Sequence, residues 1–456
     1  MEIVIVLVFV LGYLAITLEH SLKIDKLIPA LLMMALAWTG VAVGLDSFTS
    51  WFDSHTSKML EGYIGFGHEE KLELLEKTLL HHFGKTCEIL IFLIGAMTIV
   101  EIIDHFNGFA TIKDFIKTNK KRTLLWIITI LAFLLSAIID NLTATIVLIT
   151  ILRKLLPDAK DRIWYAGLII IAANAGGAWS PIGDVTTTML WMGKKVTAVK
   201  LIEYLILPSF ICVGIPVLIA SFLPAFKGTF QVSADNEKRN KHGKLMLYLG
   251  LGLIVFVPVF KTITHLPPYI GMMLSLSIIS MVAEIISSRK FNITNAVDEM
   301  SNSLESAHHH KSPTFGALSK IEMPSILFFL GILMTVAALE SLGMIFTFGQ
   351  NVQATMPNDI FILLLGVGSA VIDNVPLVAA SMGMYDMSVF PMDNHVWHFI
   401  AYAAGTGGSM LIIGSAAGVV AMGMEKISFF WYLKNISWLA LIGYVAGFVF
   451  MVLFHS

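Results

Sequence analysis

Residues 136–142 read Ser-Ala-Ile-Ile-Asp-Asn-Leu, and residues 369–375 read Ser-Ala-Val-Ile-Asp-Asn-Val. Each stretch lies at the middle of a long apolar run, so each places an aspartate deep inside a hydrophobic segment. A carboxylate at the centre of a bilayer costs several kcal/mol, and such residues mark ion pathways or specific partners. The two matching stretches therefore indicate an ion pathway or a specific partner for each aspartate inside the membrane.

The composition predicts an all-α polytopic membrane protein. The 456 residues are 56% hydrophobic and 14% charged, whereas soluble domains are about 25% charged. Apolar runs of about 18–28 residues recur along the chain, and only helices satisfy their backbone groups in lipid. A net charge of −2 argues against nucleic acid as a partner, and Cys87 and Cys212 provide no disulfide framework. The first residues lack the basic segment of a secretory signal, so residues 3–18 are expected to remain as a membrane helix.

The flanks of the two runs predict two re-entrant hairpins. Lys and Arg lie on both sides of the apolar residues 124–152, and such loops are typically cytoplasmic. A single helix over 124–152 would be about 43 Å long, longer than the ~30 Å hydrocarbon core. A hairpin entering from the cytoplasmic face explains both facts. The run 359–384 has no Lys or Arg in either flank, so its hairpin is expected to enter from the outer face.

The match between the two halves continues downstream. Gly176-Gly177 and Gly183-Asp184 correspond to Gly407-Gly408 and Gly414-Ser415. Repeats with interrupted helices and opposite orientation are typical of secondary transporters. The predicted organisation is an N-terminal transmembrane helix (1–24), a first inverted repeat (25–223) with hairpin 123–156 and broken helix 163–193, a cytoplasmic linker and connecting helix (224–262), and a second inverted repeat (263–456) with hairpin 359–384 and broken helix 396–423.

Polar residues around the predicted breaks form the candidate site. Glycine and proline should unwind the helices there and free carbonyl oxygens, which are ligands for hard cations such as Na⁺. No Lys or Arg lies in residues 124–152 of the first hairpin or in residues 359–384 of the second, which favours a cationic substrate near Asp140 and Asp184. These aspartates also suit a structural role as helix N-caps. The candidate ion- and proton-binding residues are Ser136, Asp140, Asn141, Asn174, Asp184, Thr186, Ser369, Asp373, Asn374 and Ser409.

Other titratable residues have two interpretations. Glu101, Asp104 and Glu340 lie in the helices before the hairpins, where each is either a buried proton relay or a helix-end residue whose charge reaches the membrane surface. His308-His309-His310 has the composition of a metal or pH-sensing site, but a solvated loop explains it as well.

The motifs around residues 136–145, 174–187, 369–376 and 405–409 resemble the NhaD-type sodium/proton antiporter family of the ion transporter superfamily. The resemblance covers nearly the whole chain. It implies a transport domain with two hairpins, a scaffold domain, a homodimer with elevator-type motion, and Na⁺ or Li⁺ leaving the cytoplasm as H⁺ enters. It also implies a bacterial inner membrane and no cofactor. Burial and a neighbouring carboxylate both favour protonation, so competition of H⁺ and Na⁺ for one carboxylate suffices for antiport.

Three alternatives remain at this stage. The first is a superfamily relative that carries an anion or a neutral oxyacid such as a dicarboxylate or arsenite, although aspartates at both tips disfavour an anion. An intramembrane aspartyl protease uses Gly-x-Gly-Asp, whereas Ser180-Pro-Ile-Gly-Asp184 lacks the first glycine. A channel would leave the hairpins unexplained.

Overall fold

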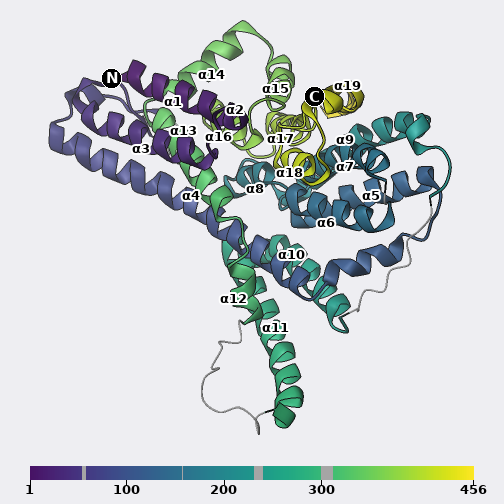
Figure 1. Ribbon diagram of the computed structural model, residues 1–456. Helices are drawn as coiled ribbons and strands as arrows, with labels where there is room; N and C mark the ends of the chain where they lie inside the picture. The colour runs from purple at the N-terminus through teal and green to yellow at the C-terminus, as the bar shows by residue number, and fades with distance from the viewer. Residues whose placement is uncertain (54–57, 157, 231–239, 299–311, 456) are drawn as a thin grey trace. The chain divides into compact units, whose positions relative to one another are not determined.

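The computed structural model describes residues 1–53, 58–156, 158–230, 240–298 and 312–455. The described chain is almost entirely helical, apart from a two-stranded hairpin of β1 (Phe52–Asp53) and β2 (Lys58–Met59) (Figure 1). Within these ranges, seven helices have the length and apolar composition to cross a membrane. The predicted all-α polytopic fold is thus confirmed. The histidines at 308–310 lie outside the described residues.

The helices divide into those before and after residue 230 (Figure 1). The first group is α1 (Glu2–Thr17), α2 (Glu19–Leu22), α3 (Leu27–Val43), α4 (His68–His105), α5 (Lys121–Ile139), α6 (Asn141–Leu155), α7 (Ala159–Ala178), α8 (Val185–Met192) and α9 (Ala198–Ala220). The second group is α10 (Gly243–Thr264), α11 (Pro268–Asp298), α12 (Pro313–Leu318), α13 (Met323–Ser341), α14 (Met344–Thr355), α15 (Asn358–Gly368), α16 (Asn374–Met384), α17 (His395–Gly407), α18 (Ala416–Glu425), α19 (Phe429–Asn435) and α20 (Ser437–His455). Short 3₁₀ segments are η1 (Leu45–Ser47), η2 (Tyr63–Gly65), η3 (Gly108–Phe115) and η4 (Pro224–Phe226).

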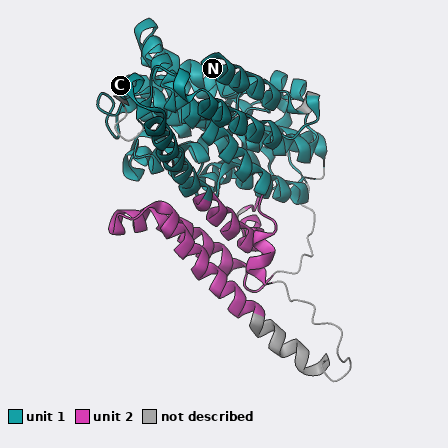
Figure 2. Ribbon diagram, turned by 90° about the vertical axis from the view of Figure 1, so that its left-hand side faces the viewer, with its two compact units in different colours: residues 1–90, 119–232, 323–456 teal, residues 91–118, 233–322 magenta. Residues whose placement is uncertain are grey.

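Packing divides the chain into two compact units (Figure 2). Unit 1 contains residues 1–90, 119–232 and 323–456, and unit 2 contains residues 91–118 and 233–322. Both predicted hairpins and both predicted broken helices fall in unit 1. The boundaries predicted from sequence describe repeats rather than packing units, so this division does not test them.

Two helices differ from their apolar runs. Helix α4 begins at His68, well before the apolar residues of its second half, and continues to His105 without interruption. Its polar first half buries Lys71, Leu75, Thr78 and His82, which lie three or four residues apart on one face of a helix. The apolar stretch of residues 321–347 does not form one helix, because Gly343 adopts a left-handed conformation (φ +70°) between α13 and α14.

The two halves of unit 1 share a packing pattern. In the first half, α5 and α6 pack on α7, and in the second α15 and α16 pack on α17. The last two-thirds of α7 and nearly all of α17 are buried on every side, which explains their abundance of Ala and Gly. These two central helices also contact each other.

The same contacts recur where each helix is interrupted. Ser136 Oγ donates to the Ala173 carbonyl (2.6 Å), and Ser369 Oγ donates to the Ala404 carbonyl (3.0 Å). Asp184 and Ser415, which begin α8 and α18, have nearly identical backbone angles of φ −147°, ψ 150° and φ −147°, ψ 154°. The halves therefore contain the same local arrangement, while their opposite orientation in the membrane remains a prediction.

Close backbone contact at two matching glycines gives the first prediction. A Cβ at Gly176 would lie 2.3 Å from the Phe133 carbonyl oxygen, and one at Gly407 would lie 2.1 Å from that of Gly366. Because backbone cannot rotate away as a side chain can, Gly176→Ala and Gly407→Ala should each destabilise by about 1–3 kcal/mol or more. The measurement is the thermal unfolding midpoint in detergent.

Gly423→Ala in α18 is the matched control, since nothing lies within 4 Å of its added Cβ. Alanine should be neutral or stabilising there because it forms helix better than glycine. Equal midpoints for all three variants would show that the close backbone contacts at Gly176 and Gly407 do not limit the size of the side chain there.

Candidate functional site

Three aspartates begin three of the helices that follow interruptions in unit 1. Asp140 precedes α6, Asp184 precedes α8 and Asp373 precedes α16. The Oδ1 atom of each accepts a backbone N–H from the first turn of its helix: from Thr143 (2.8 Å), Thr186 (3.4 Å) and Val375 (3.4 Å), respectively. The structural role as an N-cap is thus observed for all three. It leaves the second oxygen of each carboxylate for another partner.

The second oxygens have different partners. Asp140 Oδ2 accepts from the Thr143 hydroxyl (2.9 Å), so Asp140 is bound twice by its own helix. Asp184 Oδ2 accepts from Asn374 Nδ2 (3.1 Å), which lies at the start of α16 in the other half. Asp373 Oδ2 lies 3.3 Å from Lys26 Nζ. Two of the three carboxylates are therefore bound by distant parts of the chain.

Asp184 is the most deeply placed of the three. Its residue is 5% exposed, as is that of Asn374, whereas Asp140 and Asp373 are half-buried. Asp184 also lies within electrostatic reach of both other aspartates. The fold thus gathers three carboxylates from two hairpins and one broken helix into the interior of unit 1.

A second polar chain joins the first hairpin to both broken helices. Asn141 Nδ2 donates to Asn174 Oδ1 (3.4 Å), and Asn174 Nδ2 donates to Ser415 Oγ (3.0 Å). All three residues are buried. Ser415 occupies the position that corresponds to Asp184 in the repeated pattern, so one half places a hydroxyl where the other places a carboxylate.

The remaining predicted residues serve the interruptions in different ways. Ser136 and Ser369 donate to carbonyls of α7 and α17, and Ser409 Oγ donates to the Thr406 carbonyl (2.7 Å). The Thr186 hydroxyl is buried beside Asp184 and makes no hydrogen bond of normal geometry within the described chain. A buried oxygen in that state suits a ligand, because buried polar atoms are otherwise paired.

The sequence interpretation missed Lys26. The absence of Lys and Arg from the hairpins suggested a site without cations, but the start of α3 brings Lys26 to Asp373. Lys26 opens a separate apolar run, where a lysine is usually assigned to the membrane surface. No local sequence signal connects residues 347 positions apart, so only the fold reveals this pair.

Comparison with known proteins is consistent with this architecture. The family model described as Citrate transporter (CitMHS) matches residues 13–398. The chain belongs to this family. Sodium/proton antiporter 1 of Arabidopsis thaliana is 40% identical over 100% of this chain and 73% of its own length. Na(+)/H(+) antiporter NhaD of Vibrio cholerae is 29% identical over 98% of this chain and 91% of its own length. The predicted resemblance to the NhaD type is confirmed.

A solved structure shares the fold. The Alcanivorax borkumensis YdaH transporter, described as having an unusual topology, aligns with a TM-score of 0.58 at 14% identity, covering 94% of this chain and 97% of its own. This CitMHS member is therefore a multi-pass membrane protein of a transporter family rather than an enzyme.

The three candidate relay residues of this CitMHS member belong to different units: Glu101 and Asp104 to unit 2, and Glu340 to unit 1. Asp104 is exposed, which favours the interpretation as a helix-end residue. Glu101 is half-buried in unit 2, and the structure does not relate it to the aspartates. Glu340 is half-buried in unit 1 and lines a cavity of about 420 Å³ with His82, Lys195 and Asp386. Glu340 is thus the one of the three that meets other titratable groups in a cavity of unit 1.

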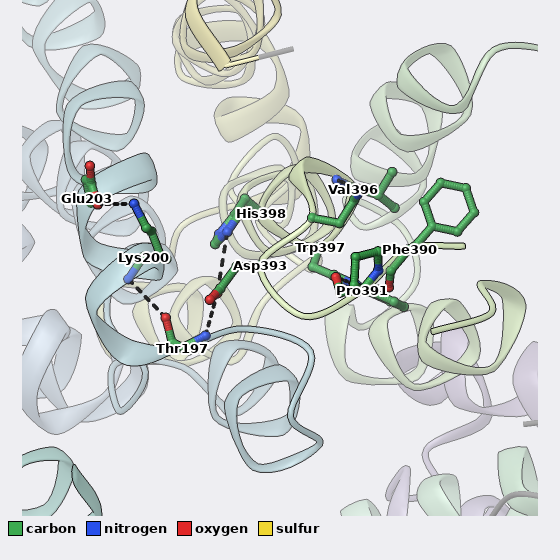
Figure 3. Close-up of polar contacts among 10 residues, drawn as sticks. Thr197, Lys200, Glu203, Phe390, Pro391, Asp393, Val396, Trp397 and His398 are labelled. Atoms are coloured by element: carbon green, nitrogen blue, oxygen red, sulfur yellow. Dashed lines mark hydrogen bonds and ion pairs between the residues drawn. The ribbon is translucent and has the colours of Figure 1, made fainter. Parts of the chain in front are cut away.

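Asp393, in the loop before α17, contacts Thr197, in the loop after α8 (Figure 3). Asp393 adopts a left-handed conformation (φ +64°), accepts from Thr197 N (2.6 Å) and donates its own N–H to the Lys195 carbonyl (2.9 Å). The Lys195 ammonium lies 4.4 Å from the centre of the Trp397 ring. The loop after α8 is thereby joined to the loop before α17.

A buried ion pair joins the far ends of three other helices. Glu425 at the end of α18 has a side chain only 2% exposed, and it binds Arg153 Nε (2.7 Å) from α6 and Arg162 Nε (2.9 Å) from α7. Arg153 also donates to the Met424 carbonyl. The first hairpin is therefore held to the second broken helix at this end as well as at Asn174.

Removing this carboxylate should destabilise the protein. Glu425→Gln removes the charge that binds Arg153 and Arg162; because Glu425 and Arg162 are 2% and 15% exposed, breaking this pair should cost about 3 kcal/mol. The thermal midpoint in detergent should fall clearly. Glu203→Gln is the control, because its pair with Lys200 is exposed and should contribute nothing measurable. A midpoint for Glu425→Gln equal to that of the control would contradict the role of this cluster.

Burial of Lys195 predicts a pH dependence of stability. Desolvation lowers the pKa of Lys195 from 10.5 to about 8, against the opposing charges of Glu340 and Asp386. Between these values the unfolded state binds more protons than the folded state, so the Lys195 contribution to unfolding free energy rises with pH. Lys195→Met should therefore be stabilising at pH 7, by on the order of a few kcal/mol, and lose this advantage between pH 8 and 10.5.

The measurement compares thermal midpoints of Lys195→Met and wild type across that pH range. Lys194→Met is the matched control, since Lys194 is the exposed neighbour. A difference between Lys195→Met and wild type that stays constant with pH would show that Lys195 titrates normally.

Proposed function

We propose that this transporter exchanges Na⁺ or Li⁺ for H⁺ by competition between the two at buried carboxylates. The observation that supports this most directly is the environment of Asp184. Its carboxylate is buried, contacts the opposite hairpin through Asn374 and lies within electrostatic reach of Asp140 and Asp373. Three negative groups in a water-poor interior repel one another, and either a proton or a small cation relieves that repulsion.

The ligands around Asp184 suit an alkali cation. Carboxylate, amide and hydroxyl oxygens from Asp184, Asn374 and Thr186 are hard donors, as such ions require. A cation arriving at Asp184 would displace a proton because both occupy the same oxygens. The relatives from Arabidopsis thaliana and Vibrio cholerae, which are named sodium/proton antiporters, support the same exchange.

The family name favours one alternative. CitMHS is described as a citrate transporter family, and Lys26 places a positive charge beside Asp373. Transport of a dicarboxylate, citrate or oxyacid is therefore the second candidate. It is disfavoured by the charge balance, since three carboxylates face a single ammonium in the hydrogen bonds and ion pairs described above. An anion would meet net repulsion there.

The fold also suggests how access alternates. Each hairpin packs on a broken helix, and Asn374–Asp184 and Asn141–Asn174–Ser415 connect the halves. These contacts would let both hairpins move as one body, as an elevator-type mechanism requires, with Na⁺ leaving the cytoplasm as H⁺ enters. A homodimer would supply the stationary partner for such motion. The bacterial inner membrane remains the predicted location, although relatives occur in a plant as well as in bacteria.

Asparagine substitutions test the proposed site. In everted membrane vesicles that maintain a pH gradient, addition of Na⁺ or Li⁺ to wild type should dissipate the gradient. Asp184→Asn and Asp140→Asn should each reduce this response at least about tenfold, because the amide cannot exchange a proton for a cation. Asp104→Asn is the control and should behave as wild type, since Asp104 is exposed.

The same vesicles distinguish the two candidate functions. Uptake of labelled citrate or succinate by wild type, without any cation-dependent proton movement, would establish the anion carrier instead. Cation-dependent proton movement of normal size in Asp184→Asn would reject the assignment of Asp184.

A further inference from the structure

Lys26 and Asp373 form an ion pair between two elements that the sequence does not connect. Lys26 caps the start of α3, and its Nζ lies 3.3 Å from Asp373 Oδ2 at the tip of the second hairpin. The side chains are 28% and 19% exposed, so the pair is largely withdrawn from solvent. The ammonium also lies 4.5 Å from the centre of the Phe328 ring on α13, where cation–π attraction holds it.

The packing around the pair fixes its position. Helix α3 packs along both α1 and α13, so the start of α3 cannot move independently of them. From α1, the Tyr13 hydroxyl is buried within electrostatic reach of Asp373 and has no hydrogen-bond partner in the described chain. Lys26, Tyr13 and Asp184 are thus the charged or titratable groups that surround Asp373 from other elements.

The pair changes the charge balance of the proposed site. Asp184 has a neutral amide on its second oxygen and Asp140 a hydroxyl, whereas Asp373 has an ammonium. An ammonium at that distance satisfies a carboxylate without a proton or a transported ion. Asp373 therefore does not need either one to remain in the interior, whereas Asp184 does.

We propose that Lys26 is a positioning residue that neutralises Asp373 permanently, so that Na⁺/H⁺ competition takes place at Asp184 and Asp140. This inference rests on the proposed function and assigns a different role to one of the three aspartates. Lys26 holds the tip of the second hairpin in place, and the tip in turn places Asn374 against Asp184. Loss of Lys26 would leave Asp373 without its counter-charge beside the ion site.

A double-substitution cycle tests this role. Lys26→Met and Asp373→Asn should each reduce cation-dependent proton movement at least about tenfold, because each leaves the other partner buried without its counter-charge. The combined Lys26→Met/Asp373→Asn variant removes both charges and should recover to within about threefold of wild type. Lys26→Arg retains the charge and should stay near wild type.

Two controls make the cycle specific. Lys23→Met removes a nearby exposed lysine and should have no effect. Lys26→Met combined with Asp184→Asn should remain inactive, since Lys26 does not pair with Asp184. Thermal midpoints in detergent are measured for every variant, and the two single substitutions should lower the midpoint while the Lys26→Met/Asp373→Asn pair restores it.

Three outcomes would overturn the proposal. If the Lys26→Met/Asp373→Asn variant is as inactive as Asp373→Asn, then Asp373 binds the ion directly. If Lys26→Met matches Lys23→Met, the pair has no consequence. If wild type shows no cation-dependent proton movement, the proposed function is wrong, and the thermal midpoints alone then test the ion pair. Losses of midpoint in Lys26→Met and Asp373→Asn that add up in the combined variant would reject the ion pair.

Discussion

A helix that is interrupted inside a membrane protein leaves backbone N–H groups that water cannot reach. In unit 1, three such interruptions are each followed by an aspartate whose Oδ1 atom accepts one of these N–H groups. A carboxylate suits this position because it has a second oxygen to offer after capping the helix. The candidate site is thus built from the groups that make the interruptions tolerable in the first place.

Because the same carboxylate caps a helix and binds a residue of the other half, binding of an ion there changes the packing between helices. The carboxylate of Asp184 both begins α8 and binds the tip residue Asn374, so a proton or cation on it alters the contact between the halves. The Asn141–Asn174–Ser415 chain makes the reciprocal connection, and the Glu425 ion pairs hold the opposite end of the same helices. Binding of a proton or a cation at Asp184 can therefore change the contacts of both hairpins without a separate signalling element.

Local sequence was sufficient for part of this picture. The aspartates inside apolar runs indicated where helices 121–155 and 358–384 would be interrupted, and the glycines and Pro181 before Asp184 indicated the interruption between α7 and α8. Sequence failed where long-range packing decides the outcome. Lys26 reaches Asp373 only because α3 packs against α13, and Glu425 meets two arginines from distant helices.

The most direct test of the central claim is a pair of structures of this transporter, one without alkali ions and one saturated with Na⁺. The account predicts an ion in contact with an Asp184 oxygen, with a rearranged Asn374 or Thr186 and an unchanged Lys26–Asp373 pair. An ion bound away from the three helix interruptions, with the Asp184 contacts the same in both structures, would contradict it.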